Sequence, residues 1–266
     1  MTETPLISVV MPVYNGAATV LAAANSVLGQ TYRNIELLVV DDQSTDDTVK
    51  LLGSVQDPRL RIISNPKRGG IGAIRRYGTA RAKGEYVAVQ DADDISYPER
   101  LGAQLEHMRR NSLKLCGTWA YLVLPDGTRE EFRHPTEPEV IRKNIIRTNC
   151  FVNSTMMFAK DAYEAAGGYD PSPGLSYVED YDLWLRMAAR FPAGNLPRIM
   201  VEYTAPRDDF RYLWREQTRT AKARLRAIAR YGYSVRHLPF VFTPLLAAFL
   251  PKRLKLKVRK ALFKGN

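Results

Sequence analysis

Residues 84–94 read GEYVAVQDADD, in which an apolar run ends in three aspartates. The run Tyr86–Gln90 has the length and the β-branched content of a buried strand, so the aspartates follow its carboxyl end. The runs Ile7–Met11 and Ile35–Val40 have the same character, and two aspartates follow the second one closely. Ligands of mostly parallel sheets bind beyond the carboxyl ends of the strands. The acidic side chains therefore predict a functional site at that edge.

Segments with helical spacing separate these strands. Helices are expected at Ala17–Leu28, Thr48–Leu52 and Gly72–Ala82, and Ser44–Asp47 offers N-cap oxygens ahead of the second one. A further strand is expected at Leu60–Ser64. Strands that alternate with helices at this spacing predict an α/β fold whose mostly parallel sheet has right-handed crossovers.

The pattern becomes mixed from about residue 113. Strands are expected at Leu115–Leu124 and Phe151–Phe158, with a hairpin-like turn, PDGT, at Pro125–Thr128. A helix is expected at Tyr181–Ala189. The 266 residues suffice to bury a sizeable core. We predict one domain through about residue 210, whose second half holds a second substrate.

Basic residues are concentrated at the end of the chain. Residues 211–266 contain 15 of the 39 Lys and Arg and one of the 28 acidic residues, which leaves 24 basic against 27 acidic residues in 1–210. The net charge is therefore about +14 in this tail and −3 before it. The apolar stretch Leu238–Pro251 is too short to span a bilayer and contains Pro244.

The amphipathic tail favours helical segments that lie on an anionic membrane surface. The alternative is a helical hairpin that packs on the preceding domain and leaves a solvated basic face. The opening residues MTETPLISVV lack the pattern of a secretory signal, and two cysteines do not form a disulfide framework. We expect a cytoplasmic protein that binds the cytoplasmic face of a membrane peripherally.

Three acidic clusters end predicted elements: Asp41-Asp42, Asp91–Asp94 and Glu179-Asp180. Asp91 and Asp93 are one residue apart, so in extended backbone their side chains point the same way and could hold a hard cation. Mg²⁺ or Mn²⁺ fits such oxygen ligands best, and it would neutralise a diphosphate leaving group. The alternative is that these aspartates are helix caps and solvated loop charges.

The series of motifs resembles the family 2 glycosyltransferases over about residues 6–190. SVVMPVYNG at Ser8–Gly16 is similar to the family's nucleotide-binding opening, and VVDDQSTDDT at Val39–Thr48 to its next signature. The stretch from Gly69 to Asp94 resembles its arginine-bearing loop and D-x-D strand end, and GGYD and EDYDLWLR follow in order. The resemblance implies a GT-A fold, in which residues 1–112 bind a nucleotide sugar and residues 113–210 bind the acceptor.

The resemblance also implies roles for matching positions. Asp93 is implied as the principal ligand of Mn²⁺ or Mg²⁺, with Asp91 contacting metal, ribose or sugar. Asp42 is implied to read the base edge, which favours a UDP or dTDP sugar because a carboxylate accepts the ring N–H. Arginine suits phosphate oxygens, and Arg68 is as well explained as a surface charge. The implied nucleotide-sugar-binding residues are Pro12, Val13, Tyr14, Asp41, Asp42, Arg68, Arg75, Asp91, Ala92 and Asp93.

Asp180 matches the family's general base, which takes the acceptor's proton in a one-step inverting displacement. On sequence alone an N-cap on the following helix is the competing interpretation of Asp180. Processive members carry Q-x-x-R-W beyond the base, whereas the nearest stretch here is RYLWR at Arg211–Arg215. Transfer of a single sugar to a hydroxyl group is therefore expected, with a lipid-linked saccharide as the acceptor that membrane binding favours.

Two other classes compete with this interpretation. A basic nucleic-acid-binding protein would use the tail on phosphates, but it leaves the carboxylate clusters unexplained, and we expect no nucleic-acid partner. A nucleotidyltransferase that makes a sugar nucleotide would normally need a glycine-rich and basic phosphate loop near its N-terminus. Residues Pro12–Gly16 lack such a loop.

Overall fold

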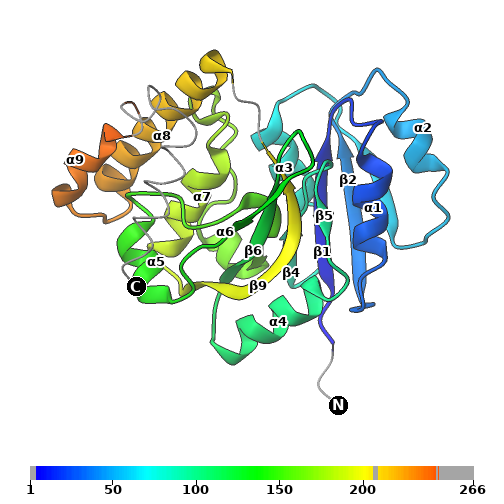
Figure 1. The fold of residues 1–266 in the computed structure, drawn as a ribbon, viewed down its shortest axis with the longest axis horizontal. Coiled ribbons are helices and arrows are strands. Elements are labelled where there is room, and N and C mark those ends of the chain that lie inside the picture. The colour runs from blue at the N-terminus through cyan, green and yellow to red at the C-terminus, as the bar shows by residue number, and fades with distance from the viewer. Residues whose placement is uncertain (1–3, 206–208, 244, 246–266) are drawn as a thin grey trace.

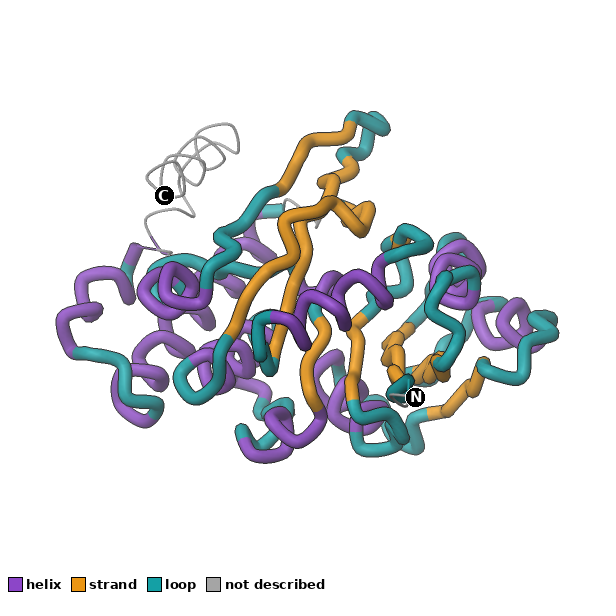
Figure 2. Tube along the Cα trace, turned by 90° about the horizontal axis from the view of Figure 1, so that it is seen from below, coloured by secondary structure: helices purple, strands orange, loops and turns teal. Residues whose placement is uncertain are grey.

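The computed structural model describes residues 4–205, 209–243 and 245. Within these residues nine strands form one sheet in the order β3-β2-β1-β4-β8-β6-β9-β5, with β7 beside β6. Figure 2 shows the strands as one twisted layer with helices on either side. The strands are β1 (Ile7–Val13), β2 (Ile35–Asp41), β3 (Leu60–Ser64), β4 (Tyr86–Val89), β5 (Ile95–Ser96), β6 (Leu115–Val123), β7 (Arg129–Phe132), β8 (Met157–Ala159) and β9 (Ala193–Thr204).

The helices flank the sheet and gather at its two ends (Figure 1). α1 and α2 lie beside the N-terminal strands, whereas α7, α8 and α9 lie at the opposite end. The helices are α1 (Val20–Leu28), α2 (Thr48–Gly53), α3 (Ile71–Thr79), α4 (Arg100–Arg110), α5 (Pro138–Asn144), α6 (Lys160–Ala165), α7 (Glu179–Ala188), α8 (Phe210–Arg230) and α9 (Leu238–Val241), with 3₁₀ turns η1 (Asn153–Thr155), η2 (Pro173–Leu175) and η3 (Val235–His237).

The first four strands pair in parallel, as the alternation of strands and helices predicts. β1 is buried along its whole length because helices cover both faces of the sheet there. Val9 and Met11 pack with α1 and α4, whereas Val10 packs with α3 and α7. The expected α/β fold with a mostly parallel sheet is confirmed.

The second half adds antiparallel pairs to this sheet. β8 joins antiparallel to both β4 and β6, and β6 runs parallel to β9. The PDGT turn is confirmed: it connects the antiparallel β6 and β7, and its Gly127 has a φ of +80°. The single strand predicted at Phe151–Phe158 is wrong, because residues 153–155 form η1 and only Met157–Ala159 are a strand.

Three helix starts differ from their predictions. α1 begins at Val20, three residues after the predicted start at Ala17. α3 begins at Ile71 and ends at Thr79, three residues before the predicted end. α7 begins at Glu179, so Asp180 lies in its first turn, and its N-cap is Val178 without a side-chain hydrogen bond. The N-cap interpretation of Asp180 is therefore wrong.

The basic tail begins as a long helix that packs on the domain. α8 contacts α7 and α9. Buried Arg224 donates to the carbonyls of Phe240 (2.7 Å) and Arg147 (2.6 Å). This part of the tail therefore packs as the hairpin interpretation requires, while residues 246–266 lie outside the described residues. Among the described residues, no helix combines the length and the apolar character needed to cross a membrane.

Gly78 sets how closely α3 approaches the sheet. A Cβ atom at this position would lie 2.7 Å from the side chains of Val10 and Val40, which is closer than packed atoms allow. We expect Gly78→Ala to lower the free energy of unfolding by about 1–3 kcal/mol, because the strands cannot recede without disturbing the core. Urea denaturation measures this change.

Gly53→Ala is the matched control, since a Cβ atom there meets nothing within 4 Å. It should leave stability unchanged or raise it by up to about 1 kcal/mol. Equal effects of the two substitutions would contradict the close packing of α3.

Candidate active site

The aspartates after β4 lie in a turn. β4 ends at Val89, and the amide of Asp94 donates to the carbonyl of Asp91 (3.3 Å). The expectation that Asp91 and Asp93 project from extended backbone is therefore wrong, because the chain reverses between β4 and β5. Buried Arg100 fixes the ends of this turn by donating to the Val89 carbonyl (2.9 Å) and the Ser96 hydroxyl (2.8 Å).

A buried arginine joins the two halves of the domain at this turn. Arg75 on α3 donates from Nη2 to Asp91 Oδ1 (2.8 Å) and from Nη1 to Glu179 Oε1 (2.6 Å). Burial lowers the pKa of the guanidinium, but the charges of Asp91 and Glu179 outweigh burial and raise it. Arg75 thus stays charged and brings two of the three predicted acidic clusters together.

Asp91 accepts three hydrogen bonds in this network. Its second oxygen, Oδ2, accepts from Asn153 Nδ2 (3.1 Å) and Ser154 Oγ (2.9 Å) of η1. Burial raises the pKa of Asp91, but Arg75 and these donors outweigh burial and lower it. Sequence reasoning did not find Asn153 and Ser154, since only the pairing of β8 with β4 places η1 beside this aspartate.

Asp180 lies at the edge of the same network. It is partly exposed in the first turn of α7, next to buried Glu179. Burial raises the pKa of Glu179 to about 7 and also raises the pKa of Asp180, while Arg75 acts against both rises. One guanidinium cannot neutralise three neighbouring carboxylates, so Asp180 is more basic than an ordinary surface aspartate.

Asp93 and Asp94 differ sharply in exposure. Asp94 is 1% exposed, and its Oδ1 accepts from the amide of Thr204 (2.7 Å), which orients the turn. Asp93 is more exposed, and within the described ranges it forms no ion pair. Partial burial and the charge of Asp91 raise the pKa of Asp93. Its carboxylate is available to a cation.

The described residues contain no cluster of three or more His, Cys, Asp and Glu side chains suited to a metal ion. A divalent cation at Asp93 would therefore need oxygen ligands from a bound diphosphate and from water, which is how Mg²⁺ is commonly held. Asp91 could join through the one lone-pair position that its three hydrogen bonds leave. The donor set fits a metal that arrives with a nucleotide.

At the other end of this edge, Asp42 holds the glycine loop. Its Oδ1 accepts from Asn65 Nδ2 (2.7 Å) and the amide of Gly69 (3.2 Å), and its Oδ2 from the amide of Gly70 (3.3 Å). A carboxylate has about four lone-pair positions, so one remains for a further donor. Asp41 accepts instead from the amide of Ser44 (3.2 Å) in the following turn.

The side chains of Tyr14 and Arg68 contact each other next to this loop. The Arg68 guanidinium lies 3.9 Å from the centre of the Tyr14 ring, and Tyr14 is 40% exposed. Pro12 and Val13 are buried in β1 below them. A Cβ atom at Gly16 would lie 4.0 Å from that of Ala92, so the turn after β4 adjoins the loop after β1. The structure thus brings all of the predicted site residues to one side of the domain, where the carboxyl ends of β1, β2 and β4 lie.

Two tyrosines also lie near these carboxylates. Tyr203 on β9 is close enough to Asp94, Asp91 and Asp180 for their charges to raise its pKa beyond the effect of burial. Burial raises the pKa of Tyr212 on α8 to about 12, and Glu216 and Asp180 add to the rise. Neither tyrosine lies in a motif, and only the packing of β9 and α8 brings them to the carboxylates.

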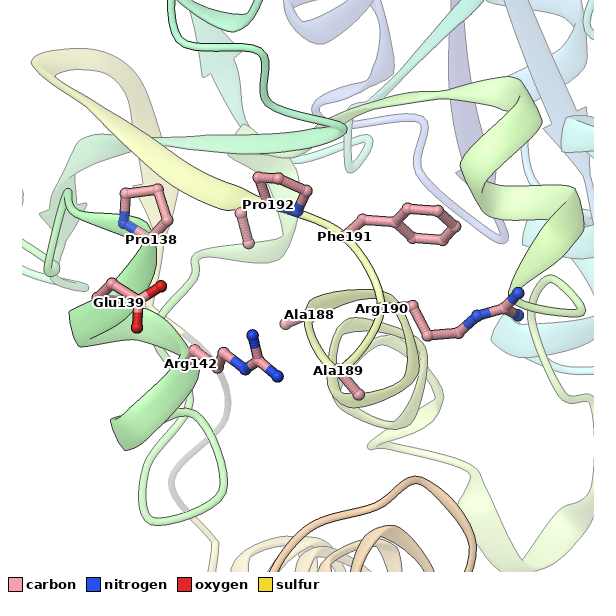
Figure 3. A pocket seen from close by; sticks show the side chains of 9 residues that line it. Pro138, Glu139, Arg142, Ala188, Ala189, Arg190, Phe191 and Pro192 are labelled. Atoms are coloured by element: carbon pink, nitrogen blue, oxygen red, sulfur yellow. The ribbon is translucent and has the colours of Figure 1, made fainter.

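A separate cavity of about 330 Å³ lies between α5 and the end of α7. Figure 3 shows its lining, with Pro138, Glu139 and Arg142 on one side and Phe191 on the other. None of the predicted site residues lines it. The cavity therefore plays no part in the site at the sheet edge.

Comparison with known proteins agrees with this arrangement. The model of a family described as glycosyl transferase family 2 matches residues 8–165, more than half of the chain. The chain is 30% identical over 207 residues to the O-antigen biosynthesis glycosyltransferase WbnJ of Escherichia coli, covering 74% of this chain and 79% of WbnJ.

Two solved structures share the fold. TarS of S. aureus in complex with UDP-GlcNAc has a TM-score of 0.65 at 18% identity and covers 93% of this chain and 82% of its own. The mannosyltransferase PcManGT of Pyrobaculum calidifontis, in complex with GDP-Man and Mn²⁺, has a TM-score of 0.64 at 19% identity and covers 98% and 81%.

The fold and the carboxylate edge define a GT-A glycosyltransferase. The chain belongs to glycosyl transferase family 2. The resemblance found in its motifs is therefore confirmed, and the two competing classes are set aside.

Replacing Arg75 should destabilise the protein, because its two carboxylate partners would lose their cation. We expect Arg75→Met to lower the free energy of unfolding by about 3–5 kcal/mol at pH 8, because Asp91 and Glu179 would be buried without their cation. The loss should shrink toward pH 5: without Arg75 the pKa values of these carboxylates rise, and the protonated forms are cheap to bury. Urea denaturation at both pH values measures it.

Arg76→Met is the matched control on the same helix, since Arg76 is exposed and donates only to the Tyr169 carbonyl (3.1 Å). It should cost less than about 1 kcal/mol at either pH. A pH-independent loss at Arg75 would contradict the charge-neutralising role.

Proposed function

We propose that this enzyme transfers one sugar from a nucleoside-diphosphate sugar to an acceptor hydroxyl with inversion at the anomeric carbon. Asp180 carries the proposal, because it is the partly exposed carboxylate at the end of the Arg75 network. It would take the acceptor's proton while the acceptor oxygen attacks and the nucleoside diphosphate departs. Its raised pKa brings its basicity closer to what proton abstraction requires.

Asp93 is proposed as the ligand of Mn²⁺ or Mg²⁺, with Asp91 as the neighbour that keeps the turn in place. The metal would stabilise the charge that develops on the departing diphosphate. The Mn²⁺ in the PcManGT complex supports this proposal, as does the exposure of the Asp93 carboxylate.

The nucleoside is proposed to bind between Tyr14 and the glycine loop, above Pro12 and Val13. The remaining lone pair of Asp42 would accept the ring N–H of uracil or thymine, which favours a UDP or dTDP sugar. The UDP-GlcNAc in the TarS complex supports a uridine donor. Arg68 would turn from the Tyr14 ring toward the diphosphate.

The acceptor is proposed to be a saccharide that is built into a cell-surface polysaccharide, and the relative WbnJ, of O-antigen biosynthesis, supports this setting. A lipid-linked saccharide is favoured by the basic tail. Val235, Leu238 and Phe242 are 68%, 42% and 56% exposed beside the basic Arg236. Such a surface would bind anionic lipid headgroups peripherally on the cytoplasmic face.

Release of nucleoside diphosphate tests the class of reaction. We expect one sugar nucleotide among UDP, dTDP and GDP donors to be hydrolysed slowly with Mn²⁺ or Mg²⁺ even without acceptor. Asp93→Ala should abolish this release. Asp180→Asn should bind the donor normally but lose about 10²–10⁴-fold in transfer rate, because the base is missing.

Asp161→Asn is the control, since Asp161 pairs with Lys114 at the opposite edge of the sheet. It should release product at the wild-type rate. Absence of turnover with every donor and both metals would refute the proposed function.

Vesicle co-sedimentation tests the membrane surface with the full chain. The triple variant Val235→Ser, Leu238→Ser and Phe242→Ser should bind phosphatidylglycerol vesicles roughly fivefold or more weakly, because burial of those side chains in the membrane is lost. Val49→Ser with Ile62→Ser is the control, because these apolar residues are also exposed, at 39% and 36%, and lie in α2 and in β3, the first strand of the sheet order. Equal binding by all three proteins would refute the membrane proposal.

A further inference from the structure

Two tyrosine side chains lie near Asp180. Tyr177 precedes α7 and is 38% exposed, and Tyr212 on α8 is partly exposed and within electrostatic reach of Asp180. Tyr212 packs edge-on against Tyr177 with ring centres 5.2 Å apart. We refer to Tyr177 and Tyr212 as the aromatic shelf. Burying these rings in a core would be the ordinary outcome for side chains of this size, so their exposure needs an explanation.

The backbone of Tyr177 is strained. Its φ is +72°, in the left-handed region that bulky side chains rarely adopt. Glycine or asparagine would occupy this position at lower cost. Strain of this kind persists where the surroundings enforce it, and it concentrates at functional sites. Here the strained residue lies two positions before Glu179, in the loop that leads into the catalytic helix.

Contacts from α8 hold this loop in place. Arg219 donates to the Ser176 carbonyl (3.0 Å), and its guanidinium lies 4.8 Å from the centre of the Tyr177 ring. Arg226 pairs with Asp170 (2.7 Å) on the other side of η2. One face of the Tyr177 ring is thus fixed by a cation, which orients the ring without burying it.

The shelf adjoins polar groups that could bind hydroxyls. Asp180 lies three residues beyond Tyr177, and both Tyr212 and Tyr203 lie within electrostatic reach of Asp180. A pyranose ring presents an apolar C–H face and a rim of hydroxyls. Flat aromatic faces beside carboxylate and phenol groups match both parts of such a ring.

We propose that the aromatic shelf binds a pyranose ring of the acceptor and directs one of its hydroxyls toward Asp180. The proposal rests on the proposed glycosyl transfer, because it makes the shelf the acceptor half of that site. Tyr177 supplies the stacking face, and Tyr212 braces it. Acceptor choice then depends on α8 and the η2 loop, apart from the donor edge at β1 and β2.

Saccharide binding by the full chain tests the shelf. The probes are methyl α- and β-pyranosides of glucose, galactose, mannose and N-acetylglucosamine, followed by saturation-transfer NMR in the presence of UDP and Mn²⁺. Tyr177→Asn removes the ring but tolerates the left-handed backbone, and Tyr177→Phe keeps the ring. We expect Tyr177→Asn to weaken pyranoside binding roughly fivefold or more and Tyr177→Phe to change it less than about twofold.

Thermal stability and UDP affinity provide the control readouts. Tyr177→Asn should unfold at the same or a higher temperature than wild type, because it relieves strain, and UDP should bind within about twofold of wild type. A merely structural role for Tyr177 would instead lower the unfolding temperature along with saccharide binding, and that result overturns the proposal. Wild-type protein that binds no pyranoside, or Tyr177→Asn that binds as wild type does, overturns it too.

Donor hydrolysis without acceptor separates this proposal from the proposed function. If the wild-type protein releases nucleoside diphosphate and Tyr177→Asn binds saccharide as well as wild type, only the proposal of the shelf is refuted. Absence of donor release refutes the glycosyl transfer on which the shelf depends, and the shelf as an acceptor site fails with it.

Discussion

The site depends on a buried guanidinium that two carboxylates share. Arg75 is held between Asp91 after β4 and Glu179 in the first turn of α7, at 2.8 and 2.6 Å. A buried ion network of this kind is a weak source of stability, because desolvation offsets much of the Coulomb attraction. The network instead fixes position. The turn after β4 and the first turn of α7 must lie together for Arg75 to neutralise Asp91 and Glu179.

Small residues allow the close packing that this ion network requires. A Cβ atom at Gly72 would lie 3.2 Å from the Cγ atom of Glu179, so glycine lets α3 approach α7 closely enough for Arg75 to reach Glu179. Asn153 and Ser154 then satisfy the remaining oxygen of Asp91. The balance leaves Asp180 with fewer cationic contacts than its neighbours and at the edge of the network, where a substrate can reach it.

The parallel half of the sheet could be predicted because its signals are local. Buried strands such as Ile35–Asp41 are continuous apolar runs, and the aspartates that follow them mark the edge where ligands bind. The roles proposed for Asp93 and Asp180 rest on the family resemblance. The break of the predicted strand at Asn153 could not be foreseen, because side chains of η1 bond to Asp91 some 60 positions earlier in the chain.

The same limit applies to the rest of the site. Tyr203 and Tyr212 carry no motif and reach the carboxylates only through the long pairing of β9 with β6 and the packing of α8. The turn at Asp91–Asp94 could not be predicted either. The spacing of its aspartates suggests extended backbone, whereas Arg100 bonds to both Val89 and Ser96 and so holds the two ends of a turn together. Long-range hydrogen bonds decided each of these positions, and no periodicity records them.

The brace that α8 gives to the η2 loop has an evolutionary consequence. The family match ends at residue 165, whereas Arg219, Arg226 and the loop they hold all follow it. Substitutions in this C-terminal part can reshape one face of the molecule while the part that the family model matches keeps folding as before. A lineage of family 2 glycosyltransferases can therefore vary one helix and one loop by drift, without remaking the strands and the turn that hold Arg75 and Asp91.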